Sequence, residues 1–322
     1  MSVAFRPFFS VITPTYNRAH TLGRAFVSLC DQTFQDFEWV VIDDGSNDAT
    51  GDLVARWQAQ ARFPIQYHWQ VNQHKKVAFN RGVARASGHF VVVLDSDDTL
   101  APNALFDMAA VWNDIPEADR HRFAAVTGLC ARPDGRIVGD AFPDDVFDAS
   151  VLDITFREGV RGEKFGCTRT DILRRFPYPE DIPGYVPESL VWRAIARAGY
   201  LTRFVNQVFR VYYPTQGSLT SQSALTTGNL PGLCLLARDT VVNCLPWFRY
   251  RPLEFFKAAA RYSRFRLALW RSGLSVPAAV HLHGAAAWCL VVLALPVGVT
   301  LHLLDQQRGG MPSESPKENR HV

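Results

Sequence analysis

The sequence has few cysteines and lacks the pattern of a disulfide framework. Its 322 residues include six cysteines, and no two of them form a CxxC pair. Domains held together by disulfides carry closely spaced cysteines in a short secreted chain. We therefore expect buried free thiols and a reducing compartment.

Two other features are missing. The first residues, MSVAFRPFFSVITPTYN, lack the basic start, apolar run and small-residue cleavage site of a signal peptide. We therefore expect the N-terminal domain to be cytoplasmic. The formal net charge is only +3, from 34 basic and 31 acidic residues, which gives no reason to expect a nucleic-acid partner.

Short apolar runs alternate with helix-like segments in the N-terminal part of the chain. This alternation is typical of βαβ units on a parallel sheet. The last strand-like run, HFVVVLD, is apolar on both faces, as a strand covered by helices on both sides must be. The expected strands are residues 8–13, 38–43, 65–70 and 89–95, and the expected helices are 20–30, 47–60 and 75–86. Further on, we expect a hairpin over 123–139, a loop at 177–187, a helix at 189–198 and an extended segment at 201–213.

Two clusters of acids follow two of these strands. Asp43 and Asp44 come after EWVVI, and Asp95, Asp97 and Asp98 come after HFVVVL. In an open α/β sheet, ligands bind outside the carboxyl ends of the strands. Carboxylates gathered there repel one another unless Mg²⁺ or Mn²⁺, bridging to a diphosphate, compensates their charge. Acids at such joins are also common turn formers and helix caps, a structural alternative that explains one cluster more easily than two.

Four segments together resemble the donor-binding half of the family 2 glycosyltransferases. These are PTYNR at 14–18, VVIDDGSNDAT at 40–50, NRGVARASG at 80–88 and VVVLDSDD at 91–98. The resemblance is strong over residues 8–105 and looser to about residue 220. It implies a GT-A fold, with a Rossmann-like, mostly parallel sheet and helices on both faces. It also implies inverting transfer from a nucleotide-diphosphate sugar, commonly a UDP-sugar, with Mn²⁺ or Mg²⁺ as the cofactor.

The resemblance also assigns roles to residues of the donor site. Asp97 would coordinate the metal together with Asp95, which would also face the ribose; Asp44 would contact the base. Lys75 matches a lysine of this family, although Gln73 and His74 replace the usual glycines before it. The expected nucleotide-sugar-binding residues are Pro14, Thr15, Tyr16, Asn17, Asp43, Asp44, Lys75, Asp95, Ser96 and Asp98.

The base that accepts the acceptor hydroxyl's proton is expected further along the chain. Family members often carry a Glu-Asp pair before a helix that ends in a small residue, Gly and Tyr. The matching stretch here is VPESLVWRAIARAGY at 186–200, which places Glu188 at the aspartate position and Pro187 at the glutamate position. Glu188 is therefore the candidate base. It also suits a helix N-terminus, and the two roles are compatible.

A second departure from the family pattern affects the diphosphate side. Many relatives have a histidine after the next strand, whereas this chain has RVYYPTQGSLT at 210–220. The possible replacements are Arg210, Tyr212, Tyr213 and Gln216. Glu163 and Lys164 resemble a Gly-acid-Lys segment found in a subset of the family and could meet the donor sugar or the acceptor. A surface salt pair is the alternative for these two residues.

The C-terminal part is first basic and aromatic, then apolar. Residues 249–271 carry seven basic side chains against one acid, and 272–304 carry no formal charge. Residues 285–304 are about long enough to cross a bilayer core, or they could dip into it or pack as a buried soluble helix. The basic segment is expected to contact an anionic membrane surface and to keep the catalytic domain cytoplasmic.

These observations predict a GT-A catalytic domain at 1–222, with a nucleotide-sugar half (1–105) and an acceptor half (106–222). Amphipathic helices (223–274), an apolar membrane-inserted or re-entrant helix (275–305) and a disordered tail (306–322) follow. The expected enzyme transfers sugar to a lipid-linked or envelope glycan acceptor at the cytoplasmic face of the membrane. A polyprenyl-phosphate acceptor and a non-catalytic nucleotide-sugar-binding protein are the alternatives.

Overall fold

The computed structural model describes residues 6–214, 226–274 and 276–307. Contacts divide the chain into two compact units. The first comprises 1–178 and 191–215, and the second comprises 179–190 and 216–322.

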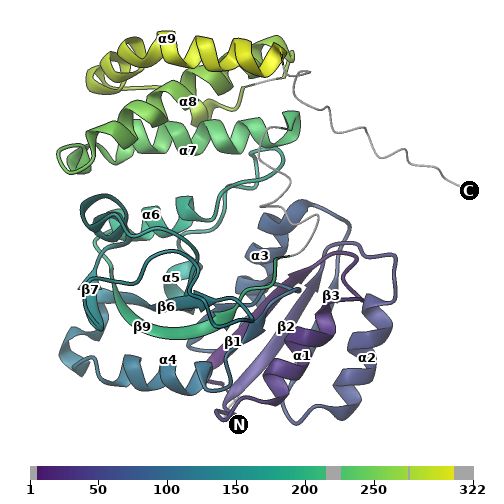
Figure 1. Ribbon diagram of the computed structural model, residues 1–322. Coiled ribbons are helices and arrows are strands. Elements are labelled where there is room, and N and C mark those ends of the chain that lie inside the picture. Colours follow the sequence, from purple (N-terminus) through teal and green to yellow (C-terminus); the bar gives the residue numbers. More distant parts are fainter. Residues whose placement is uncertain (1–5, 215–225, 275, 308–322) are drawn as a thin grey trace, which may run out of the picture. The chain divides into compact units, whose positions relative to one another are not determined.

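The first unit is built on one mixed sheet, in the strand order β3-β2-β1-β4-β8-β6-β9-β5, with β7 paired to β9 (Figure 1). Four neighbouring strands, β3, β2, β1 and β4, are parallel. The strands are β1 Phe9–Thr15, β2 Phe37–Asp43, β3 Ile65–Trp69, β4 Phe90–Val93, β5 Thr99–Leu100, β6 Phe123–Ala131, β7 Val146–Ala149, β8 Lys164–Arg169 and β9 Leu201–Val211.

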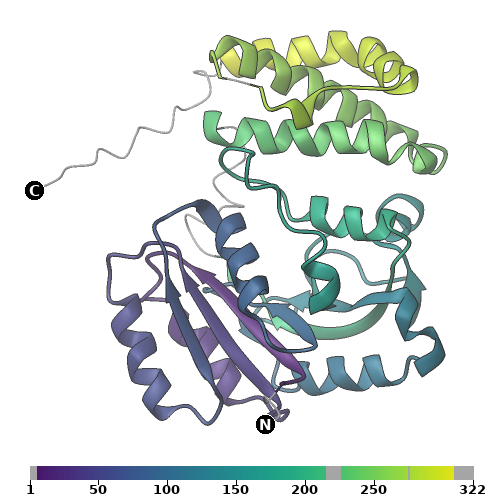
Figure 2. The same cartoon turned by 180° about the vertical axis from the view of Figure 1, so that it is seen from behind.

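Helices cover both faces of the parallel strands. Figures 1 and 2 show α1 and α2 on one face and α3 on the other. The helices of this unit are α1 Leu22–Cys30, α2 Thr50–Gln60, α3 His74–Arg85, α4 Ala104–Asn113, α5 Thr170–Leu173 and α6 Ser189–Arg197, whose first two residues fall in the second unit. The short helices are η1 Glu117–Arg122 and the π-helix η2 Asp153–Glu158.

The expected α/β architecture is confirmed, and the four N-terminal strands lie where the apolar runs predicted them. Strand β4 is covered on both faces, because Phe90, Val91 and Val92 are all buried. The main core lies on the α1 and α4 side of the sheet, around the fully buried Trp39. The second half differs from a simple parallel sheet: β8 is antiparallel to both β4 and β6.

The glycine that ends the NRGVARASG segment has a structural explanation. A Cβ on Gly88 would lie 2.6 Å from the Ser10 amide nitrogen. The Gly88 N–H donates to Ser10 Oγ at 2.8 Å. The segment after α3 therefore lies against β1 at a distance that only glycine permits.

The second unit is helical. Its long helices are α7 Leu230–Asn243, α8 Pro252–Arg271 and α9 Ala285–Gln307, and its short ones are η3 Thr227–Asn229, η4 Leu245–Trp247 and η5 Ala278–Val280. Helix α8 packs on both α7 and α9 (Figure 1). By length and composition, α9 could cross a membrane, with a mean hydropathy of 2.2. The tail was predicted to begin at 306, but α9 extends to Gln307. From 308 onward the predicted tail lies outside the described residues.

Candidate active site

The first part of the site lies where β1 and β2 end side by side. The two strands are parallel, with Thr15 opposite Asp43. The Asp44 N–H donates to the Thr15 carbonyl oxygen at 2.8 Å. Asn17 follows with a positive φ of 52°, a conformation that asparagine tolerates better than most residues. Its N–H donates to Ser46 Oγ at 2.8 Å, so the turns after the two strands are joined.

Asp43 and Asp44 both accept hydrogen bonds from β3 or from the residues that follow it. Asp43 accepts a hydrogen bond from the Tyr67 hydroxyl, at 2.7 Å. Asp44 Oδ1 accepts from Gln70 Nε2 at 2.7 Å and from the Gln73 N–H at 2.9 Å. Burial raises the pKa of the Asp44 carboxyl above its ordinary value, although the Gln73 and Gln70 hydrogen bonds act in the opposite direction. The acids expected to meet the nucleotide therefore also order the chain after β3.

Sequence reasoning missed the part played by Tyr67 and Gln70. Tyr67 lies within β3, and Gln70 directly follows it, beside the end of β2. The rule that side chains at the carboxyl ends of parallel strands meet would have identified Gln70.

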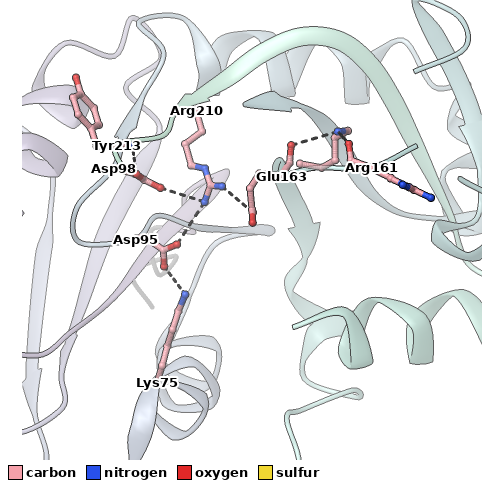
Figure 3. Close-up of polar contacts among 8 residues, drawn as sticks. Lys75, Asp95, Asp98, Arg161, Glu163, Arg210 and Tyr213 are labelled. Atoms are coloured by element: carbon pink, nitrogen blue, oxygen red, sulfur yellow. Dashed lines mark hydrogen bonds and ion pairs between the residues drawn. The ribbon is translucent and has the colours of Figure 1, made fainter. Parts of the chain in front are cut away.

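A second cluster connects the end of β4 with the distant strand β9 (Figure 3). Lys75 Nζ lies 2.6 Å from Asp95 Oδ1. The guanidinium of Arg210 lies 3.5 Å from Asp95 Oδ2, 3.4 Å from Asp98 Oδ2 and 3.2 Å from Glu163 Oε2. Three predicted residues therefore converge at Arg210, namely Asp95, Asp98 and Glu163 of the expected Gly-acid-Lys segment. Lys75 joins the cluster through Asp95.

Strand pairing brings Arg210 to this position. Leu100 of β5 lies opposite Arg210, and Thr99 lies opposite Val211. The Tyr213 N–H donates to Asp98 Oδ1 at 2.9 Å. Short antiparallel pairing thus brings the end of β9 beside the acids that follow β4.

The acids of this cluster differ in their affinity for protons. Burial acts to raise the pKa of Asp95, but the charges of Lys75 and Arg210 outweigh it and lower that pKa. Burial raises the pKa of Asp98 to about 7, despite the opposing effects of Arg210 and the Tyr213 N–H. Asp95 is therefore held as a carboxylate, whereas Asp98 can take up a proton near neutral pH.

Asp97 differs from both neighbours. It is partly exposed, whereas Ser96 and Asp98 are buried. Within the ranges that the structure describes, its carboxylate has no hydrogen bond or ion pair to the protein. Those ranges also contain no group of three or more His, Cys, Asp or Glu side chains that could hold a metal alone. One available carboxylate is the donor set that suits Mg²⁺ or Mn²⁺ when the substrate's phosphates provide the other oxygens.

The remaining predicted residues lie in different surroundings. The Lys164 ammonium donates to the Arg161 carbonyl oxygen at 2.8 Å, and burial lowers its pKa. Glu188 is partly exposed and directly precedes α6. Gln216 lies outside the described residues.

The contacts of Arg210 predict a large effect on stability. Replacing Arg210 with methionine is expected to lower the free energy of unfolding by about 3 kcal/mol. This is the low end for a broken buried ion pair, and we expect the low end because Lys75 still neutralises Asp95 in the variant. The deficit should be smaller at pH 5 than at pH 8. Asp98 has a raised pKa in the folded state, so its protonation stabilises the fold at low pH and this contribution disappears as the pH rises through about 7.

Urea unfolding at pH 5 and pH 8 measures the free energy of unfolding of each variant and so tests this prediction. The matched control is Arg136→Met, because Arg136 pairs with Asp134 at 2.6 Å on the surface, with 73% of the arginine side chain exposed. We expect no measurable change in the control. Equal losses in the two variants would contradict a structural role for the buried cluster.

Known proteins match this chain in sequence and in structure. Residues 10–127 match the model described as "Glycosyl transferase family 2". The chain is 39% identical over 212 residues to a GalNAc(5)-diNAcBac-PP-undecaprenol beta-1,3-glucosyltransferase of Campylobacter jejuni, covering 64% of each protein. For three further curated relatives the match spans only 32% or 14% of their length.

Two solved structures share the fold. One is S. aureus TarS 1-349 in complex with UDP-GlcNAc, with a TM-score of 0.58 and 18% identity over 94% of this chain and 92% of that one. The other is the mannosyltransferase PcManGT of Pyrobaculum calidifontis in complex with GDP-Man and Mn²⁺, with a TM-score of 0.57 and 20% identity over 94% of this chain and 89% of that one. Residues 10–127 therefore resemble the family 2 glycosyltransferases, and the chain has the GT-A fold that these two structures share.

Proposed function

We propose that this protein transfers a sugar, with inversion, from a nucleotide-diphosphate sugar to a lipid-linked or envelope glycan acceptor. A UDP-sugar is the proposed donor, and a divalent metal is the proposed cofactor. The observation that carries the proposal is the arrangement of acids after β4. Lys75 and Arg210 hold Asp95, while the partly exposed Asp97 carboxylate remains available to a ligand.

The donor would occupy the carboxyl ends of the parallel strands. Asp44 would contact the base from the end of β2, beside the turn formed by residues 14–17. Asp95 would face the ribose, where its lowered pKa keeps it an acceptor for hydroxyl groups. Asp97 would hold Mn²⁺ or Mg²⁺, which when bound stabilises charge on the departing diphosphate.

Glu188 is the proposed general base. Its carboxylate would accept the proton of the acceptor hydroxyl while the hydroxyl oxygen bonds to the anomeric carbon and the bond to the diphosphate breaks. A carboxylate is suited to this role because its oxygens can accept the proton of an attacking hydroxyl group. Its place directly before α6 would also let it interact with the helix N-terminus.

The proposed acceptor and location rest on two separate observations. The Campylobacter relative is named for an acceptor carried on undecaprenyl diphosphate. Helix α9 combines high hydropathy with exposed apolar side chains. Both favour an enzyme at a membrane. The proposed side is the cytoplasmic face, where the basic segment at 249–271 would meet anionic lipid.

A panel of nucleotide sugars tests the donor proposal. We expect one UDP-sugar to raise the melting temperature of the protein when Mn²⁺ is present and to lose this effect in EDTA, because ligands that bind the folded state stabilise it. Turnover of the same donor with membrane extract should then be metal-dependent. Stabilisation without turnover would instead favour a non-catalytic binding protein, and a response limited to GDP-sugars would overturn the assignment of the base.

A further inference from the structure

Helix α9 presents an apolar face to its surroundings. Residues 285–304 carry no formal charge, yet Leu293 is 68% exposed and Val292 is 61% exposed. The other large exposed apolar side chains of this helix are Trp288, Leu295, Val297, Leu303 and Leu304. Soluble monomers rarely leave apolar side chains exposed along a whole helix, so this face is suited to an apolar partner.

The opposite face of α9 packs against α8. A stripe of small and apolar residues is buried together with His302, and it comprises Ala287, Leu290, Val291, Ala294 and Gly298. A Cβ on Gly298 would lie 2.6 Å from Ser263 Cβ and 2.7 Å from the Ala260 carbonyl oxygen, both in α8. Arg264 Nε of α8 also lies 2.6 Å from Asp305 Oδ2 near the end of α9. The two helices therefore pack closely side by side (Figure 1).

Helix α8 is too basic to enter the hydrocarbon core of a bilayer. It carries Lys257, Arg261, Arg264, Arg266 and Arg271, and Lys257, Arg261 and Arg271 are exposed. Charged side chains are costly at the centre of a membrane but favourable at its anionic surface. Because α9 packs beside α8, it could span the bilayer only by taking α8 with it or by breaking away. Breaking away would expose the Gly298 stripe and the Arg264–Asp305 ion pair.

We propose that α9 lies flat in the surface of an anionic bilayer and does not span it. Its outward apolar face would enter the boundary between headgroups and acyl chains, to a depth of about 5–10 Å. Packed helix axes lie about 8–10 Å apart, so α8 would lie at the level of the lipid phosphates. Its lysine and arginine side chains could then reach the phosphates. The inference rests on the proposed membrane location but requires no sugar transfer, so it can fail or succeed independently of the enzymatic assignment.

Flotation of the full-length protein with vesicles tests the proposal. The vesicles are phosphatidylcholine alone or phosphatidylcholine mixed with phosphatidylglycerol. We expect binding to the anionic vesicles, and a reduction of at least about tenfold in Val292→Glu/Leu293→Glu. The matched control is Ala55→Glu/Ala59→Glu, which adds the same charge at exposed positions of α2. Lys257→Gln/Arg261→Gln should remove most of the preference for anionic lipid.

Topology is measured with a C-terminal epitope tag on vesicle-bound protein. A flat helix leaves the tag and the N-terminal unit equally open to added protease, and alkaline carbonate releases the protein. A protected tag, or resistance to carbonate, would overturn the proposal in favour of a spanning helix. Equal vesicle binding by wild type and Val292→Glu/Leu293→Glu would overturn it as well. A third outcome would also overturn the proposal. In it, wild type forms a dimer without lipid, as measured by light scattering, and does not float with vesicles, whereas Val292→Glu/Leu293→Glu is a monomer.

Discussion

Replacing Asp97 with alanine is expected to abolish sugar transfer, lowering kcat/KM by at least about a thousandfold, or about 4 kcal/mol of transition-state stabilisation. Asp97 is partly exposed, and in the described parts of the chain its carboxylate has no polar partner. The variant should therefore fold normally, with an unchanged melting temperature in the absence of ligand. The loss would arise because the metal that Asp97 is proposed to hold would no longer balance the negative charge of the departing diphosphate.

Two measurements separate this role from a structural one. The first is turnover of the donor identified by the nucleotide-sugar panel, and the second is the Mn²⁺-dependent rise in melting temperature, which Asp97→Ala should lose. The control is Asp52→Ala, which removes an exposed acid from the first turn of α2. If Asp97→Ala keeps more than about a tenth of wild-type turnover, the metal is not held by this residue.

The neighbouring acids are expected to behave differently from Asp97. Asp95 bonds Lys75, and Asp98 accepts the Tyr213 N–H. Substituting either residue would also disturb the cluster around Arg210, so a loss of activity there could arise from altered structure. Asp97 is the more direct probe because its side chain makes no such contact among the described residues.

Replacing Glu188 with glutamine is expected to lower kcat at least about a hundredfold while the affinity for the donor stays unchanged. Glutamine keeps the size and polarity of glutamate but cannot accept the acceptor's proton. A residue that only interacts with the helix dipole would give a different result, because its loss would lower stability by up to about 1 kcal/mol without affecting kcat.

Donor affinity by calorimetry and single-turnover transfer test this prediction together. The control is Glu180→Gln, which alters an exposed acid of the same segment of the second unit. Unchanged turnover in Glu188→Gln would show that another group takes the proton.

Much of the N-terminal half was predictable because its signals are local. Apolar runs over 38–43 and 89–95 correspond to β2 and β4, and helical spacing corresponds to α1, α2 and α3. Both strands are buried in the sheet interior, so nearly every residue in them is apolar and the pattern is easy to recognise. The positions of Asp43 and Asp97 followed from the same runs, since Asp43 ends β2 and Asp97 lies four residues after β4.

The second half of the sheet was harder to predict. Strand β6 was visible as an apolar run, but its neighbours β8 and β9 lie far from it along the chain. The contact of Arg210 with Asp95 joins residues 115 positions apart. Apolar periodicity says which face of a strand is buried and nothing about which strand lies beside it.

In the C-terminal unit, too, the sequence predicted the helices but not how they pack on one another. Composition predicted a basic amphipathic helix and an uncharged apolar one, and α8 and α9 agree with it. Whether the apolar helix stands alone or packs on the basic helix depends on Gly298 and on the pairing of Arg264 with Asp305.

The sequence alone therefore determined the resemblance to a family, the parallel strands and the acids at their ends, because short motifs and apolar runs are formed by neighbouring residues. Only the tertiary structure decided which of these acids are neutralised by Lys75 and Arg210 and which one remains available. It also decided that one face of α9 packs against α8. Both depend on close contacts between segments that are distant in the chain, and such contacts form only when the whole fold is packed.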